Sequence, residues 1–106
     1  MDFAQIFRGI SAGLLVTDAN FKVIWANDFE YRYYKKELLG LYVVDCHKEE
    51  NREKIKDFLE KFRTGELKEF TKIAQGMVIT YSSYFKDGAF AGLVRARIPL
   101  PKTDSK

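Results

Sequence analysis

The stretch VIWANDFEYRYY, residues 23–34, decides the fold because its character changes at Asn27. Residues 22–26 have the composition of a strand, whereas the polar and aromatic residues after Asn27 favour a helix. Asn is a common helix N-cap, and Glu30 follows it by three positions. We therefore predict a capping box, in which the Asn27 side chain accepts from the Glu30 N–H and Glu30 reaches back to the Asn27 N–H. The strand ends where the helix begins.

The residues before this stretch predict a β-hairpin. Residues 13–17 (GLLVT) are apolar, residues 18–21 (DANF) contain turn formers, and residues 22–26 return as the partner strand. Before the hairpin, apolar residues spaced at i, i+3, i+4 and i+7 predict a short amphipathic helix that ends between Gly9 and Gly13.

The residues after this stretch predict three strands behind two helical segments. A helical turn is expected at 36–39, closed by Gly40, and a longer helix at 49–63, with Gly65 as its stop. Strands are expected at 68–74, 77–85 and 89–98, joined by tight turns. The predicted order is ββαααβββ, which is a single α+β domain.

Composition excludes several classes of protein. The chain of 106 residues has no apolar run long enough to span a bilayer, and we expect neither a secretory signal nor a membrane partner. A net charge of +3, with acidic and basic residues interleaved, argues against a nucleic-acid partner. The single Cys excludes an intrachain disulfide framework and a multi-Cys metal site, so we expect a cytoplasmic protein without a metal centre.

Three segments together resemble the PAS domain family. These are GLLVTDANFKVIWAN (13–27), KKELLGLYVVDCHKEENREKI (35–55), and RTGE (63–66) followed by three strands with KDGAFAG (86–92) before the last. The resemblance implies an antiparallel five-stranded sheet of order 2-1-5-4-3, with helices on one face. We accordingly divide the chain into an N-terminal amphipathic helix (1–12), a PAS domain (13–98) and a flexible tail (99–106).

The resemblance also implies a pocket between sheet and helices that holds haem, flavin, a small organic acid or nothing. Strand alternation, with Arg95 and Arg97 expected outside, and the helix positions predict which residues line it. A packed core without a ligand remains the alternative, since apolar residues at core spacing usually form core. The predicted lining residues are Leu15, Thr17, Ile24, Ala26, Phe29, Tyr33, Val44, Ile55, Phe58, Tyr81, Val94 and Ala96. Tyr81 and Ser83 are the polar groups expected nearest to it.

The sequence does not identify the cofactor. The flavin-adduct motif of light-sensing relatives is absent, because Cys46 follows Gly40 by six residues and no Asn–Cys pair is present. At the position that the resemblance assigns to the proximal His of haem-binding relatives, this chain has Lys54. Haem therefore remains an alternative only through His47 or Cys46, either of which can be an axial ligand.

We expect no catalysis, because Asp45, Cys46 and His47 are the one candidate set of nucleophile, base and orienting group, and three consecutive residues do not converge easily on a substrate. The resemblance implies a sensory or interaction module in signal transduction, with a signalling effector domain or protein as partner. Alternation also predicts an apolar outer sheet face, which the N-terminal helix of a second copy would cover, although the helix of the same chain could cover it instead. The predicted homodimer contacts are Phe3, Ile6, Phe7, Ile10, Val23 and Trp25.

Overall fold

The structure, a computed structural model, describes residues 2–102. Nine elements follow one another within this range, and the predicted ββ–helices–βββ order is confirmed. They are α1 (Phe3–Phe7), β1 (Gly13–Thr17), β2 (Val23–Ala26), α2 (Asp28–Tyr34), the 3₁₀ helix η1 (Val43–Cys46), α3 (Glu49–Thr64), β3 (Glu69–Ala74), β4 (Met77–Lys86) and β5 (Ala89–Pro99).

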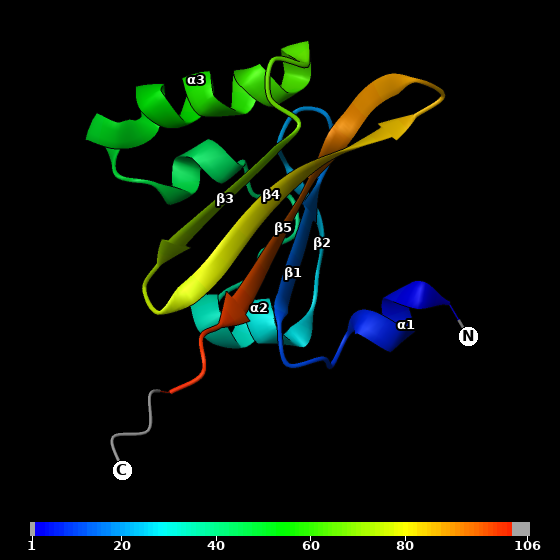
Figure 1. Ribbon diagram of the computed structural model, residues 1–106, viewed down its shortest axis with the longest axis vertical. Helices are drawn as coiled ribbons and strands as arrows, with labels where there is room; N and C mark the ends of the chain where they lie inside the picture. The colour runs from blue at the N-terminus through cyan, green and yellow to red at the C-terminus, as the bar shows by residue number, and fades with distance from the viewer. Residues whose placement is uncertain (1, 103–106) are drawn as a thin grey trace.

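The five strands form one antiparallel sheet in the order β2-β1-β5-β4-β3, as predicted. In Figure 1, α3 lies at one end of the sheet and α2 at the other end. We call the face that the helices cover the inner face. Two core clusters fill the space beneath the helices, one around Phe62 and Leu93 and the other around Leu15 and Leu38.

The long helix α3 matches the prediction closely. Its apolar stripe buries Leu59 and Phe62, while Ile55 and Phe58 pack against the same cluster. It ends at Gly65, which has a φ of 87°. This left-handed conformation carries little steric cost in glycine, and it closes the helix.

The predicted alternation of β2 is wrong. Val16 of β1 pairs with Trp25 and Thr17 pairs with Val23, so a β-bulge leaves Ile24 without a partner in β1. Because of this extra residue, the β2 side chains before Trp25 point to the opposite face of the sheet from the one that strict alternation predicts. Val23 is therefore buried in the core instead of lying on the outer face, and the Ile24 side chain is 51% exposed instead of lining a pocket.

Two predicted helical segments also differ from the structure. The expected turn at 36–39 is not helical, because Lys35 ends α2 in the left-handed conformation, and the next helical element is η1. Helix α1 begins after the Asp2 cap, whose side chain accepts from Gln5 N at 2.9 Å, and it ends at Phe7. Ile10 therefore lies outside the helix, so the expected stripe is shortened by its last member.

Within residues 2–102, no helix combines the length and apolar composition that crossing a bilayer requires.

Candidate functional site

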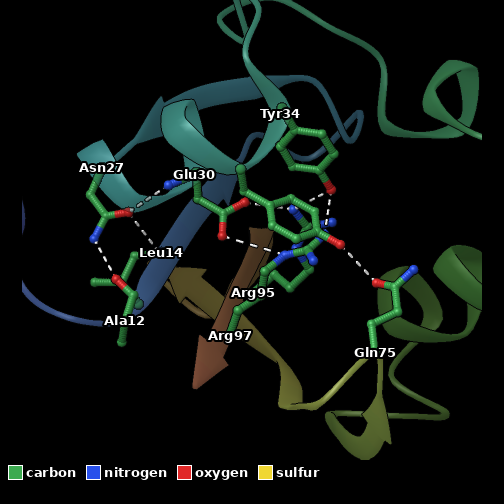
Figure 2. A network of polar contacts seen from close by, with 9 residues as sticks. Ala12, Leu14, Asn27, Glu30, Tyr34, Gln75, Arg95 and Arg97 are labelled. Carbon is green, nitrogen blue, oxygen red and sulfur yellow. Dashed lines mark hydrogen bonds and ion pairs between the residues drawn. The ribbon is translucent and has the colours of Figure 1, made fainter. Parts of the chain in front are cut away.

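Asn27 joins the first hairpin, α2 and the N-terminal segment. Its side chain is completely buried, and Oδ1 accepts from Leu14 N at 3.0 Å and from Glu30 N at 3.4 Å. Its Nδ2 donates to the carbonyl oxygens of Phe7 at 3.0 Å and Ala12 at 2.8 Å. Figure 2 shows this amide between the start of α2 and the chain that leads into β1. The predicted cap is present, and it also holds the residues before β1.

The second half of the predicted capping box is wrong. The Asn27 N–H donates to Leu14 O at 3.0 Å instead of to Glu30. The Glu30 carboxylate turns toward β5, where Oε1 lies 2.8 Å from Arg95 Nη2 and Oε2 lies 3.4 Å from Arg97 Nε. Glu30 is completely buried, so this carboxylate is the counter-ion of two guanidinium groups beneath the helices (Figure 2).

The predicted facing of β5 is likewise wrong. Leu15, which points into the core, pairs with Arg95, and antiparallel partners share a face. Val94 and Ala96, which pair with Val16 and Leu14, therefore lie on the outer face and line no pocket between sheet and helices. Arg95 and Arg97 point inward because the Glu30 carboxylate is buried on the same face, and a buried charge is tolerated where an opposite charge pairs with it.

Tyr34 completes this buried network. Its hydroxyl accepts from Arg95 Nη2 at 3.0 Å and from Arg97 Nη2. Burial by itself would lower the pKa of Arg95, but Tyr34 and Glu30 outweigh that effect and raise the pKa above its ordinary value. Arg95 is therefore a permanent cation. Three donors of the network, Arg95 Nε, Arg97 Nε and Arg97 Nη1, are buried without a hydrogen-bond partner among the described residues, as is the acceptor Glu30 Oε2.

Two adjoining cavities lie between the helices and the inner face. One, of about 270 Å³, has mostly apolar walls; we call it the α3 cavity, and it is lined by Val43, His47, Ile55, Phe58, Leu59, Phe70, Lys72, Tyr81 and Arg95. The other, of about 280 Å³, is more polar; we call it the α2 cavity, and it is lined by Tyr33, Tyr34, His47, Lys72, Ala74, Gln75, Ile79, Tyr81, Arg95 and Arg97. His47, Lys72, Tyr81 and Arg95 belong to both.

Several residues predicted to line a pocket lie on these walls. Ile55 and Phe58 line the α3 cavity, Tyr33 lines the α2 cavity, and Tyr81 lines both. Leu15 and Thr17 border a space of only about 20 Å³, which has room for little more than one water molecule.

Three other predicted residues pack elsewhere. Ala26 and Val44 belong to the two core clusters. Phe29 lies against Gly13, where an added Cβ would come within 2.9 Å of the Phe29 ring. Their apolar spacing predicted burial, but it did not distinguish core from cavity wall.

His47 and Cys46 differ in their surroundings. His47 lines both main cavities, whereas Cys46 is an exposed free thiol that borders a smaller space of about 50 Å³. Burial lowers the pKa of His47, and the nearby positive charges of Arg95, Lys72 and Arg52 lower it further. The imidazole is therefore held toward its neutral form.

Sequence reasoning missed the cationic part of the site. Lys72 lies on the inner face of the edge strand β3, with its Nζ 5.9 Å from the centre of the Tyr81 ring. Arg95 and Arg97 were predicted outside because charged residues at alternate strand positions usually face water. The signal that could have placed them inside is the Asn27–Glu30 spacing, since a carboxylate in the first turn of a helix that covers the sheet needs a partner there.

Comparison of the sequence with protein-family models and with curated proteins gives no match. Comparison of the structure does give matches. The PAS domain of BvgS from Bordetella pertussis superimposes with a TM-score of 0.75 over 94% of this chain and 85% of that chain, at 13% identity. The fold is that of a PAS domain. A C-terminal domain from Streptococcus mutans superimposes equally well, with a TM-score of 0.75 over 92% of this chain and 81% of that chain, at 17% identity.

The PAS fold places the cavities between the sheet and its helices, but it does not by itself assign a ligand or an activity. Those are argued from the residues that line the site.

Proposed function

We propose that this PAS domain is a non-catalytic sensory module of the cytoplasm that binds a small ligand between its helices and its sheet. The observation that supports this proposal is the pair of adjoining cavities, about 270 and 280 Å³, which share Arg95. The α3 cavity has mostly apolar walls and a few converging polar groups, a combination that is typical of small-molecule sites.

The network around Arg95 suggests how occupancy reaches the rest of the molecule. Arg95 binds Glu30, and Glu30 lies in the first turn of α2, which Asn27 caps. Asn27 in turn holds the carbonyl groups of Phe7 and Ala12. A ligand that moves the Arg95 guanidinium would therefore change the packing of α2 and the position of the N-terminal segment, from which a signalling partner would receive the change.

Native mass spectrometry of freshly purified protein tests the ligand site. We expect a retained small molecule in the wild type, and its loss in Phe70→Trp, which enlarges a side chain on the α3 cavity wall. Phe85→Trp, at an exposed position away from the main cavities, is the matched control and should retain the ligand. Two negative results together would contradict the proposal. The spectra would show no added mass, and hydrogen exchange of the cavity-lining amides would be the same with and without a small-molecule extract of the cells that produced the protein.

We also propose that the module forms a homodimer through α1 and the outer sheet face. Phe3, Ile6 and Phe7 are 74%, 46% and 41% exposed, so α1 does not bury its apolar side chains against its own sheet. Figure 1 shows α1 at the opposite end of the molecule from α3. The outer face presents Trp25, Val16 and Val94 in one row, each partly exposed. A second copy would cover both surfaces.

Light scattering at micromolar concentrations tests the dimer. We expect a dimer mass for the wild type and a monomer mass for Trp25→Arg and for Phe3→Ser combined with Ile6→Ser. Phe85→Ser, also at an exposed aromatic position, should leave the mass unchanged. A wild-type monomer, or a dimer that survives both sets of substitutions, would show that this interface is wrong.

Haem binding is the second candidate, and the observation that favours it is the place of His47 on both cavity walls. A neutral imidazole is the form that coordinates a metal, and the lowered pKa of His47 favours that form. His47 would be the axial ligand, and Arg95 and Lys72 would pair with the propionates. Haem would supply redox or gas-binding chemistry. Titration with haem should then give a shifted Soret band, and His47→Ala should abolish the shift. A spectrum unchanged by this substitution would exclude His47 as the axial ligand.

A further inference from the structure

The shared wall of the two cavities carries an excess of positive charge. Arg95 and Arg97 approach a single carboxylate, that of Glu30, so one positive charge beneath the helices is not balanced within this group. Lys72 adds a second positive charge at the edge strand. Among residues 2–102, those that line the α3 and α2 cavities include no Asp and no Glu.

Hydrogen-bond donors in this region are also in excess. Arg95 uses Nη2 for both Glu30 and Tyr34, while its Nε is buried without a partner among residues 2–102. Arg97 Nε and Nη1 are likewise buried without a hydrogen-bond partner there, against one acceptor in the same state, Glu30 Oε2, which lies 3.4 Å from Arg97 Nε. A buried donor without a partner costs free energy, and an incoming acceptor that carries negative charge relieves this cost best.

The rest of the α3 cavity wall is mostly apolar and aromatic. The rings of Phe70 and Tyr81 stand edge-on to Phe58, with centroids 5.1 and 5.2 Å away, and Ile55 adds an aliphatic surface. A cavity of about 150 Å³ lined by apolar side chains is enough to hold benzene. The α3 cavity, at about 270 Å³, has room for one ring and a short side chain.

We propose that the ligand of this site is a small carboxylic acid with an apolar, ring-sized body. This inference rests on the proposed ligand-binding function and names its chemical class. The carboxylate lies between Lys72 and Arg95, and the body lies against Phe58 and Phe70. An amine with the same body is repelled by the two cations, and a neutral alcohol leaves their charge unbalanced.

Binding of an anion at Arg95 also links the ligand to the route described above. A ligand carboxylate shares the guanidinium with Glu30 and weakens the hold of Arg95 on the first turn of α2. A neutral ligand of the same shape fills the cavity but does not compete with Glu30 for the Arg95 guanidinium. The sign of the ligand charge, and not only its volume, therefore decides whether α2 responds.

Three probe molecules of matched body test the charge requirement with the full chain: phenylacetate, 2-phenylethanol and 2-phenylethylamine. NMR titration follows the amides of the lining residues and the ring of His47, the single histidine of the chain. We expect phenylacetate to bind roughly tenfold or more tightly than the alcohol, and the amine to bind most weakly. Added salt should weaken the binding of phenylacetate only.

Two variants assign the contact. Lys72→Gln, at an exposed position that does not endanger folding, should reduce phenylacetate affinity roughly tenfold and leave the alcohol unaffected. Lys68→Gln, four residues earlier and also exposed, is the matched control and should change neither. Arg95→Gln should abolish the preference for the acid, with a denaturant melt to show that the variant is folded.

The outcomes separate this inference from the proposal on which it rests. Equal binding of acid and alcohol at the cavity, or preference for the amine, would overturn the anionic class and leave ligand binding intact. Acid binding that is indifferent to both Lys72→Gln and Arg95→Gln would overturn the assigned contact. If all three molecules left the lining amides unchanged at millimolar concentration, the inference and the ligand site would both be wrong.

Discussion

The two faces of β5 carry chemistry that is the reverse of the usual pattern. On the inner face, Arg95 and Arg97 are 8% and 6% exposed, and they sit beneath the helices. On the outer face, Val94 and Ala96 are partly exposed, and Ile98 is 50% exposed. The inner face is held by one buried carboxylate, whereas the outer face has only its own apolar neighbours. The comparison shows that alternation separates two sets of residues, while a buried counter-ion decides which set points inward.

The largest expected effect tests whether the Glu30 carboxylate holds the inner face. Glu30→Gln keeps the shape but leaves two buried guanidinium groups without a counter-ion, which should lower the free energy of unfolding by about 3–5 kcal/mol. The matched control is Glu60→Gln, in the exposed pair with Arg63 at 3.2 Å, which should cost less than about 1 kcal/mol. Denaturant melts compare the two. Equal midpoints would mean that Glu30 and the arginines are not paired inside the protein.

The next effect concerns Asn27, which places Glu30 at the start of α2. Asn27→Ala removes the cap and leaves the partly buried Phe7 and Ala12 carbonyls without their donor, so we expect a loss of about 2–3 kcal/mol. Asn20→Ala, in the exposed hairpin turn, should change stability by less than about 0.5 kcal/mol. Hydrogen exchange should show that residues 3–12 lose protection in the first variant alone. Similar melts for both variants would argue that Asn27 makes no buried bonds.

Two alanines sharpen the comparison between the faces directly. Ala26 is packed in the core near Leu15 and Leu38, and Ala26→Leu should cost about 1–3 kcal/mol because the added volume has no space. Ala96 lies on the outer face, and Ala96→Leu should cost less than about 0.5 kcal/mol. Thermal or denaturant melts measure both. If Ala96→Leu were the more harmful substitution, the inner and outer faces of β5 would have to be exchanged.

The smallest expected effect is a pKa shift at the cationic end of the inner face. His47 is surrounded by Arg95 from β5, Lys72 from β3 and Arg52 from α3, and its pKa should lie below the ordinary value of 6.5. The unfolded chain then binds this proton more readily than the folded chain, so stability should decrease as the pH falls below about 6.5. NMR titration of this single histidine measures the pKa directly.

Lys72→Gln removes one of these charges and should raise the pKa of His47 toward its ordinary value, whereas Lys68→Gln should leave it unchanged. A wild-type His47 that titrates at 6.5 or above would show that the imidazole does not face the cationic wall.

Local signals in the chain were sufficient for the five strands, the long helix α3 and their order, although they also predicted a helical turn at 36–39 that the structure lacks. The apolar stripe of α3 and the glycine after it predicted this helix to within one residue at its C-terminal end. The turn residues between β3, β4 and β5 predicted the strands with similar accuracy. These features depend on neighbours in the sequence, through hydrogen bonds and side-chain spacing within a few residues. The resemblance then supplied the strand order, which no local signal contains.

The facing of β2 and β5 was predicted wrongly, for two different reasons. In β2, a bulge at Ile24 shifts the alternation by one residue, and it arises from pairing with β1 and not from the sequence of β2 alone. In β5, the arginines point inward because Glu30, which is 65 positions before Arg95, is buried opposite them. The cationic wall of the cavities therefore could not be found from spacing within one strand.

The order of the elements, the helix cap at Asn27 and the boundaries of α3 and of the last three strands follow from the sequence, because short-range backbone geometry and capping set them. Which face of each strand is covered, and which side chains meet in the cavities, was decided only in the folded molecule. Burial of a charge depends on a partner brought from a distant part of the chain, and free energy is lost if either partner is buried without the other. Local patterning predicts the hydrophobic contacts of this PAS fold, whereas its polar site exists only where α2, β3 and β5 come together.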